Sequence, residues 1–224
     1  GYVLDGQKGI KDPVGMNGFR LDVECHIVLG ASTAIQNLVK AVQGLGVNIR
    51  GLVAEPLASA EAVLTDDERD MGVILVDMGG GTTGIAVYNE GTIWHTASLP
   101  VGGGHFTNDV AVGMRVNSAV AEEMKIRYGR ADVAGVDSQE QIDVHDSQTG
   151  RRSVSRKELC EIIKERAIEL FRLVDTDVKK ACPNFTPAAG LVLTGGMANL
   201  PGLDTIAREA LRLPVRVGKP MGVA

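Results

Sequence analysis

The stretch Val76–Gly91, with the sequence VDMGGGTTGIAVYNEG, carries the pattern that decides the fold. Gly72–Met78 is an almost continuous apolar run, which predicts a buried strand with an acidic residue near its end. Three glycines then predict a tight turn into a second strand, Thr83–Asn89, and a Glu-Gly turn leads into a third, Thr92–Pro100. We therefore expect an antiparallel meander of three strands.

Around this meander, the apolar spacing alternates between the periods of strands and helices. Residues 1–18 and the acidic stretch 65–70 are expected to be a loop and a solvated turn, and the polar residues 130–154 a small inserted subdomain. Further strands are expected at 19–29, 48–54, 141–145, 151–154, 190–194 and 215–218, with a turn at 149–150, and helices at 32–43, 56–64, 107–115, 118–128, 156–180 and 202–211. This order predicts an α/β fold with a sheet of mixed direction.

The composition excludes several classes of protein. Glycine accounts for 28 of the 224 residues, above the usual share of about 7%. Hydrophobic residues at 44% exclude a disordered linker, and the glycines do not recur at every third position as in collagen. The net charge of −5 argues against a polyanion-binding surface, so nucleic acid is not an expected partner. No apolar run approaches the roughly 20 residues that cross a bilayer.

A candidate phosphate-binding loop follows the first strand of the meander at Asp77–Thr83. Glycines lack a Cβ, so their backbone amides can face a ligand, and threonine hydroxyls add further donors. The candidate phosphate-binding residues are Gly79, Gly80, Gly81, Thr82 and Thr83. Asp77 is suited to a metal ion that accompanies phosphate. A plain hairpin turn is the alternative, but it needs neither three glycines nor a buried acid.

A second glycine loop, Leu193–Met197, lies at the end of a predicted strand and ahead of a helix. Gly195 and Gly196 would let a flat ring lie against the backbone, and helix amides nearby can meet an anion. A Gly-Gly strand exit is common in α/β proteins, so this loop alone is weak evidence. Together with the first loop, it indicates a nucleotide site.

Three further groups of residues are ambiguous. Glu122 and Lys125 are three residues apart on a predicted helix, where they could bind a ribose and a purine, but an exposed ion pair is the favoured interpretation. Gly102–Gly104 suits a strand-to-helix corner at least as well as a ligand contact. Glu55 precedes Pro56 at a helix start, where a carboxylate is favourable for the helix dipole alone.

These residues resemble the motifs of the actin/Hsp70/sugar-kinase ATPase superfamily. Asp77–Thr83 resembles its second phosphate motif, Leu193–Met197 its adenosine motif, and Glu55–Ala60 its connecting helix. Within the superfamily the chain is most similar to the FtsA family of bacterial cell-division proteins, through residues 4–21, 55–68, 76–91, 100–114 and 121–131. The resemblance implies an actin-like (RNase H-like) ATPase half with a mixed five-stranded sheet, a small inserted subdomain and part of a family-specific subdomain.

The resemblance also implies ATP and Mg²⁺ as cofactors. Asp77 would bind Mg²⁺ directly or through water, and Gly79–Thr82 would hold the β- and γ-phosphates. Glu55 would orient the attacking water. Proteins of this family are at best slow ATPases, so ATP would act mainly as a conformational and polymerisation switch. Contacts to the rest of the nucleotide would come from Glu122 and Lys125 on ribose and adenine, and from Gly195, Gly196 and Met197 as its wall.

For the whole protein, the resemblance implies an adaptor that forms filaments and tethers FtsZ polymers to the cytoplasmic face of the inner membrane at the septum. Expected partners are the C-terminal tail of FtsZ, further copies of the chain and other divisome proteins, with the membrane reached through a segment missing here. The implied boundaries are 1–46 for the end of the family-specific (SHS2) subdomain, 47–70 for a connecting strand and helix, 71–129 with 181–224 for the second ATPase half, and 130–180 for an inserted subdomain that receives the FtsZ tail.

Two departures from the family pattern bear on ATP use. Gly84 stands where an aspartate usually follows the glycine loop, which removes a carboxylate beside the phosphates. The first phosphate loop of the superfamily would lie upstream of Gly1, so we expect a piece of a longer protein that holds half of a nucleotide clamp. Weak or undetectable ATP binding by this piece alone is the consequence.

Two alternatives stay open. A type IV pilus-assembly relative in the same superfamily would bind a short partner peptide, and residues 130–180 would distinguish it. A chaperone or sugar-kinase ATPase would need a substrate-binding part that the sequence does not display, and a kinase would transfer phosphate to a small acceptor.

Overall fold

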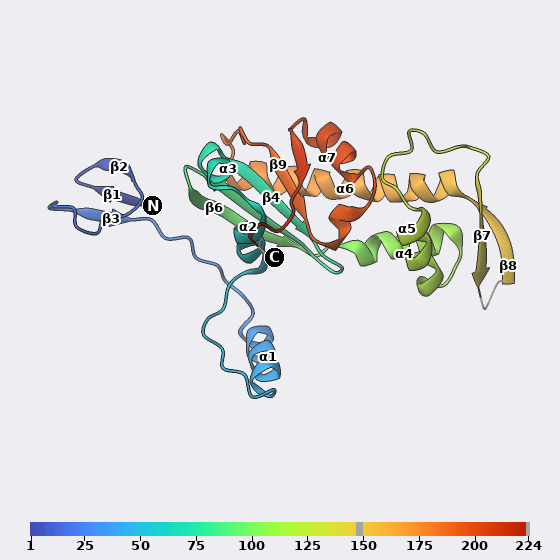
Figure 1. The fold of residues 1–224 in the computed structure, drawn as a ribbon, viewed down its shortest axis with the longest axis horizontal. Helices are drawn as coiled ribbons and strands as arrows, with labels where there is room; N and C mark the ends of the chain where they lie inside the picture. The colour runs from blue at the N-terminus through green and yellow to red at the C-terminus, as the bar shows by residue number, and fades with distance from the viewer. Residues whose placement is uncertain (147–149, 223–224) are drawn as a thin grey trace.

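A mixed five-stranded sheet lies at the centre of the computed structural model, which describes residues 1–146 and 150–222 (Figure 1). The strand order is β10-β9-β4-β5-β6, in which β4, β5 and β6 form the antiparallel meander and the other pairs are parallel. The strands are β4 (Val73–Met78), β5 (Thr83–Asn89), β6 (Thr92–Leu99), β9 (Leu191–Thr194) and β10 (Val215–Val217). The predicted fold class and the meander are confirmed.

Helices cover both faces of this sheet, so β4 is buried along its whole length. Ile74, Val76 and Met78 belong to the larger hydrophobic core, whereas Val73 and Leu75 alternate to the opposite face and pack with the helix α2. The larger core includes residues of α4 (Gly103–Met114), α5 (Ser118–Tyr128), α6 (Arg156–Ala181) and α7 (Leu203–Leu211), and the smaller one those of α2 (Glu55–Val63). Because Asp77 continues the series of Val73 and Leu75, its side chain lies on the α2 side.

The long helix α6 connects the sheet to a hairpin of β7 (Gln141–Asp146) and β8 (Gly150–Ser155) at the far end of the molecule (Figure 1). His95 of β6 fixes one end of α6, since its Nε2 lies 2.8 Å from Oδ2 of Asp177. Arg152 of β8 donates to the carbonyls of Met114 and Arg115 at the end of α4. The two predicted strands of residues 130–154 are therefore present, while Thr149 of the expected turn lies outside the described residues.

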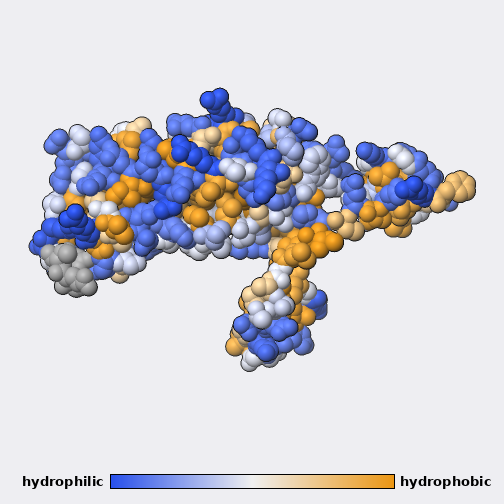
Figure 2. All heavy atoms as spheres, turned by 180° about the vertical axis from the view of Figure 1, so that it is seen from behind, coloured by the Kyte–Doolittle hydropathy of each residue, from blue (hydrophilic) through white to orange (hydrophobic). Residues whose placement is uncertain are grey.

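The first 54 residues extend away from this body (Figure 1), but they touch it where Lys11 pairs with Asp70 at 2.9 Å and where His26 Nε2 lies 2.9 Å from Thr96 Oγ1. They form a small sheet in the order β2-β1-β3 and a helix, α1, in which no residue is buried. Apolar side chains of residues 27–53 stay exposed, among them Ile27, Leu29 and Leu52. Figure 2 shows hydrophobic surface on the part of the molecule that extends from the body. The elements are β1 (Tyr2–Leu4), β2 (Gln7–Ile10), β3 (Leu21–Val23) and α1 (Ser32–Gln43).

Several local expectations were wrong. Residues 1–18 contain two strands in place of a loop, the strand expected at 19–29 shrinks to β3, and residues 48–54 form no strand. A strand needs a neighbour for its backbone hydrogen bonds, and residues 48–54 have none within the described part of the chain.

The acidic stretch 65–70 also differs from the expected turn, because it contains a short helix, α3 (Asp66–Met71). Its start is a capping box: the amide of Glu68 donates to Thr65 Oγ1, and the amide of Thr65 donates to Glu68 Oε2. The helix expected at 107–115 begins at Gly103, so Thr107 lies inside α4. No helix in residues 1–146 and 150–222 has the length and apolarity needed to cross a membrane.

Candidate functional site

The two predicted glycine loops lie side by side. They follow β4 and β9, which are parallel neighbours, and Asp77 on β4 pairs in register with Thr194 on β9. Both loops therefore leave the sheet at the carboxyl ends of adjacent strands, where open α/β sheets bind their ligands. The second loop continues into a single turn of 3-10 helix, η1 (Gly196–Asn199), which we did not predict.

Asp77 lies between the two loops and is 8% exposed. Its Oδ2 accepts a hydrogen bond from the hydroxyl of Ser59 on α2. Its Oδ1 lies against the backbone of Gly195, because a Cβ built on that glycine would be 2.5 Å from this oxygen. Gly195 also has a φ of +84°, so the position favours glycine both for its backbone conformation and for the space beside the carboxylate.

The first loop has free backbone donors. The amide of Gly79 closes the loop by donating to the carbonyl of Thr82 at 2.9 Å. Within the described residues, the amides of Gly80, Gly81 and Thr82 donate to no backbone carbonyl, and these three residues are exposed. Successive free amides in a tight loop form a concave anion site. Thr83 differs from its neighbours, since it is buried and its hydroxyl donates to the carbonyl of Val101 at 2.7 Å.

Gly102–Gly104 form a third glycine loop, whose hydrogen bonds hold the first glycine loop in place. The amides of Gly103 and Gly104 donate to the carbonyls of Gly79 and Gly80, at 2.9 and 2.7 Å. A Cβ on Gly102 would lie 2.7–2.8 Å from three backbone atoms of the first loop, which requires glycine there. Gly102–Gly104 is thus a strand-to-helix corner, as expected, and it also holds the first loop in place.

Lys125 of α5 is 5% exposed, so the exposed ion pair that the sequence favoured is wrong. Its ammonium group donates to Thr107 Oγ1 at 2.8 Å and to the carbonyl of Gly103 at 3.1 Å, and lies 2.7 Å from Glu122. Burial alone raises the pKa of Glu122, but hydrogen bonds from Lys125 and Thr107, together with the lysine charge, hold that pKa below its usual value. The cluster fixes α5 to the start of α4. The sequence spacing of Glu122 and Lys125 did not predict that Thr107 takes part in it.

Two further sequence-predicted positions, Glu55 and Gly84, lie at the start of α2 and on the strand beside Asp77. Glu55 is the first residue of α2, is exposed, and precedes Ser59 by one helical turn. Gly84 is the cross-strand partner of Asp77, and a Cβ there would lie 2.7 Å from Cγ of Pro56. The missing side chain at position 84 therefore lets the start of α2 approach the sheet closely, beside the carboxylate of Asp77.

The arrangement is compatible with Mg²⁺ only in company with a phosphate. No group of three or more His, Cys, Asp or Glu side chains in residues 1–146 and 150–222 is placed to hold a metal ion. Mg²⁺ is usually bound through one or two carboxylates, phosphate oxygens and several waters. Asp77 beside a loop of free amides meets that requirement.

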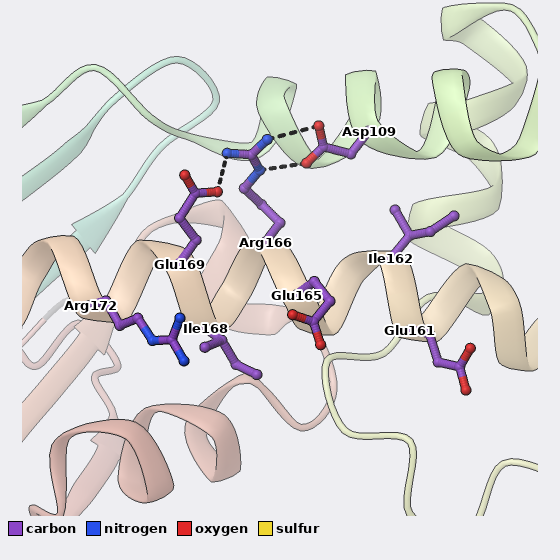
Figure 3. Close-up of a pocket in the computed structure, with 8 residues that line it drawn as sticks. All are labelled: Asp109, Glu161, Ile162, Glu165, Arg166, Ile168, Glu169 and Arg172. Atoms are coloured by element: carbon purple, nitrogen blue, oxygen red, sulfur yellow. Dashed lines mark hydrogen bonds and ion pairs between the residues drawn. The ribbon is translucent and has the colours of Figure 1, made fainter.

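A separate cavity of about 620 Å³ lies between α4 and α6, away from all three glycine loops. Figure 3 shows Arg166 of α6 reaching across it to Asp109 of α4, with Nε and Nη2 2.5 and 2.9 Å from the two carboxylate oxygens. Arg166 also pairs with Glu169 at 2.6 Å. The cavity is lined by Asp109, Glu161, Ile162, Glu165, Arg166, Ile168, Glu169 and Arg172.

Comparisons with known proteins agree on one family. Residues 74–224 match the model of the cell division protein FtsA, and residues 1–29 match that of the SHS2 domain inserted in FtsA. The chain is 42% identical to the cell division protein FtsA of Pseudomonas aeruginosa, over 99% of this chain and 54% of that protein. It is also 42% identical to the FtsA protein of Neisseria meningitidis, over 98% of this chain and 53% of that protein. The chain thus spans about half the length of these curated relatives.

Solved structures show the same actin-like fold at lower identity. MreB5 of Spiroplasma citri bound to ADP is 21% identical, with a TM-score of 0.70 over 85% of this chain and 61% of that one. The MamK double helical filament is 20% identical, with a TM-score of 0.65 over 84% of this chain and 61% of that one. The PilM–PilN complex of type IV pilus biogenesis is 18% identical, with a TM-score of 0.62 over 82% of this chain and 47% of that one.

Proposed function

The chain belongs to the FtsA family of cell division proteins, and on this premise we propose that it supplies one half of an ATP-binding site in a bacterial cell-division protein. One observation carries the proposal. Two glycine loops meet at the ends of adjacent parallel strands, with the nearly buried carboxylate of Asp77 between them. Free amides bind phosphate and a strand-end carboxylate binds its metal ion, which is the combination that a nucleoside triphosphate needs.

We assign the phosphate end of the nucleotide to the first loop. The free amides of Gly80, Gly81 and Thr82 bind the β- and γ-phosphates, and Asp77 holds Mg²⁺ directly or through water. The loop stays closed through Gly79, whose amide is already engaged. Thr83 fixes the third glycine loop through Val101, so its role is to shape the site.

The adenosine end is assigned to the second loop and to α5. Gly195 and Gly196 form a wall against which the base and ribose lie, and Met197, which is buried in the larger core, supports that wall from behind. The side chain of Glu122 is 46% exposed and ionised, so it can accept a hydrogen bond from a ribose hydroxyl. Lys125 contributes through its position, because its three ammonium donors already meet Glu122, Thr107 and Gly103.

ATP serves this protein mainly as a switch and is hydrolysed slowly at most. Glu55 is the candidate for orienting a water molecule, and its place at the start of α2 is on the same side of the sheet as Asp77. Gly84 supplies no second carboxylate beside Asp77. Support for nucleotide binding comes from MreB5, a protein of the same fold whose structure contains ADP.

In the whole protein, we propose a role as an adaptor that forms filaments and links FtsZ polymers to the cytoplasmic face of the inner membrane. Family membership supports the septal role, and the MamK filament supports self-association, because it has the same fold. Residues 130–180, which include most of α6, are our candidate for receiving the tail of FtsZ. A pilus-assembly role rests on an 18% identical fold alone, and we do not propose it.

The decisive experiment measures ATP binding to the full-length protein by isothermal titration calorimetry, with Mg²⁺ and with EDTA. We expect Asp77→Asn to weaken binding of Mg²⁺-ATP by about tenfold or more, consistent with loss of an ion-binding carboxylate. Asp67→Asn, an exposed acid on α3, is the matched control and should bind as the wild type does. Absence of ATP binding by the wild type, or equal binding by Asp77→Asn, would refute the site.

A second experiment tests whether residues 130–180 bind the tail of FtsZ. A fluorescent FtsZ tail peptide is titrated into the full-length protein and into a variant that lacks residues 133–154, the inserted hairpin and its approach. We expect binding to the wild type and a large loss in the variant, while pelleting with ATP reports filament formation. Undiminished peptide binding by the variant would place the FtsZ contact elsewhere.

A further inference from the structure

The carboxylate of Asp77 is held from one side by a residue outside all three glycine loops. Ser59 lies in the middle of α2, and its hydroxyl donates to Asp77 Oδ2. A serine inside a helix often bonds back to the carbonyl four residues earlier, which here belongs to Glu55. In this helix the hydroxyl crosses to the neighbouring strand and contacts the acid of the candidate site.

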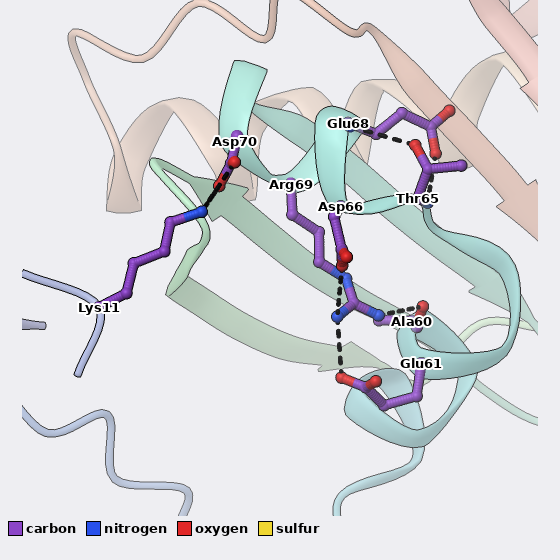
Figure 4. A network of polar contacts seen from close by, with 8 residues as sticks. All are labelled: Lys11, Ala60, Glu61, Thr65, Asp66, Glu68, Arg69 and Asp70. Carbon is purple, nitrogen blue, oxygen red and sulfur yellow. Dashed lines mark hydrogen bonds and ion pairs between the residues drawn. The ribbon is translucent and has the colours of Figure 1, made fainter. Parts of the chain in front are cut away.

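The helix that carries Ser59 is itself fixed at its other end. α2 has no basic residue in its last turn, and it ends on Leu64 in an extended conformation, without the usual glycine. External donors meet its last carbonyls: the amide of Met221 donates to Ala62 at 2.8 Å and Arg216 to Val63 at 2.8 Å. Arg69 donates to Ala60 at 3.0 Å, in addition to the amide of Leu64. Figure 4 shows Arg69 between α2 and α3 in this network.

Contacts at both ends of α2 explain why this helix keeps one position on the sheet. Arg216 of β10 also forms a two-point contact with Glu68, with both N–O distances 2.6 Å. Pro56 at the start of the same helix packs against Gly84 of β5. With β10 and β5 fixing opposite ends of α2, the hydroxyl of Ser59 has a defined place above Asp77.

The bond from Ser59 leaves one oxygen of Asp77 available. Oδ1 makes no hydrogen bond within the described residues and lies on the side of Gly195, at the junction of the two glycine loops. Oδ1 is not a fully buried atom. It therefore retains contact with solvent, where a cation would arrive.

We propose that Ser59 is a positioning residue for Asp77, which fixes the carboxylate so that Oδ1 faces a divalent cation bound to the phosphates. This assignment rests on the ATP site proposed above. Without the hydroxyl, the carboxylate rotates among its other rotamers, and cation binding must select one of them. A preorganised ligand avoids that cost, so Ser59 strengthens binding of the metal complex and leaves metal-free nucleotide unaffected.

The test uses the full-length protein and compares ATP affinity with Mg²⁺ and with EDTA. It includes the wild type and four variants: Asp77→Asn, Ser59→Ala, Ser59→Thr and Ser98→Ala. We expect Ser59→Ala to weaken binding of Mg²⁺-ATP roughly fivefold to tenfold, the scale of one hydrogen bond to a charged group. Binding in EDTA should not change. Ser59→Thr keeps the hydroxyl and should stay within about twofold of the wild type. Ser98→Ala makes the same chemical change at an exposed position on β6 and serves as the control.

The outcomes separate this inference from the proposed site. Loss of affinity in Asp77→Asn with no loss in Ser59→Ala overturns the inference and keeps the site. Equal losses by Ser59→Ala with Mg²⁺ and with EDTA also overturn it, because they assign Ser59 a general structural role. If neither the wild type nor any variant binds ATP, the proposed site itself fails. Alanine is a better helix former than serine, so α2 is preserved in the variant.

Discussion

Gly102 offers the most direct test of how the glycine loops are assembled. A Cβ at this position would lie 2.7 Å from the carbonyl carbon of Gly81 and the amide nitrogen of Thr82, and 2.8 Å from the carbonyl oxygen of Gly79. All three are backbone atoms, so no side-chain rotation can make room. Gly102→Ala must therefore push the start of α4 away from the first glycine loop.

The cost can be worked from the bonds that this movement breaks. Two amide-to-carbonyl bonds, from Gly103 to Gly79 and from Gly104 to Gly80, join the loops at 2.9 and 2.7 Å. At a net value of about 1 kcal/mol each, their loss lowers the free energy of unfolding by about 2 kcal/mol. Strain in the displaced backbone adds to this value, so we expect a loss of about 2–3 kcal/mol.

Urea unfolding of the chain, followed by circular dichroism, measures this loss. Gly80→Ala is the matched control, because a Cβ there meets no atom within 4 Å and its φ is not positive. We expect Gly80→Ala to keep or slightly raise the free energy of unfolding, since alanine restricts the unfolded chain. Wild-type stability of Gly102→Ala, or equal losses in the two variants, would refute the packing of the loops described here.

Three further predictions concern single side chains. Gly195→Ala places a side chain at φ +84° and ψ 174°, a conformation that favours glycine, and a Cβ 2.5 Å from Asp77 Oδ1, so thermal unfolding should show a loss of about 1–3 kcal/mol and calorimetry weaker Mg²⁺-ATP binding. Lys125→Met removes the buried ammonium group that donates to Thr107 and Gly103 and pairs with Glu122, and we expect a loss of about 1–3 kcal/mol in urea unfolding. Hydrogen bonding from Arg216, which outweighs the effect of burial, lowers the pKa of Glu68 in the folded state, so this carboxylate stabilises the fold above its unfolded pKa of about 4.3. The stability gap between wild type and Glu68→Gln should then be full at neutral pH and shrink as pH falls below that value in thermal scans.

The central sheet could be predicted because its signals are local. β4 is a continuous apolar run, and short turns connect it to β5 and β6, so neighbouring residues in sequence are also neighbours in the sheet. The long helix α6 has a clear apolar period and differs from the predicted 156–180 by one residue. Patterns of this kind need no knowledge of distant parts of the chain.

The expectations that were wrong depend on distant partners or on overlooked local signals. Residues 48–54 have the composition of a strand, but no second strand lies beside them in the described chain. Lys125 was expected at the surface, yet it is buried because α4 places Gly103 and Thr107 above its ammonium group. The capping box at Thr65 was present in the sequence as Thr-Asp-Asp-Glu, and recognising it would have predicted α3.

The candidate site shows the same division. Asp77 and its glycine loop are contiguous in sequence, so the pattern alone identified them. The role of Ser59 could not be predicted, because only the packing of α2 on the sheet brings its hydroxyl to the carboxylate of Asp77. The contact of Gly102 with the first loop likewise depends on where the end of β6 returns to the site. Residues that support a site from neighbouring elements carry little signal of their own.

The length of α6 makes this helix a rigid connection between the sheet and the hairpin. Its 26 residues correspond to about 39 Å of straight helix, which is held by a hydrogen bond to His95 of β6 near one end and by an ion pair to Asp109 of α4 near the middle. The hairpin β7–β8 lies at the other end of α6 (Figure 1), where Arg152 bonds it to the end of α4. If α6 turned by about 5° about its contact with β6, the hairpin would move by about 3 Å. α4 would move with it, because the Asp109–Arg166 ion pair and the bonds of Arg152 join the two helices. Movement of α4 would in turn reach the first glycine loop, because the amides of Gly103 and Gly104 at the start of α4 donate to Gly79 and Gly80.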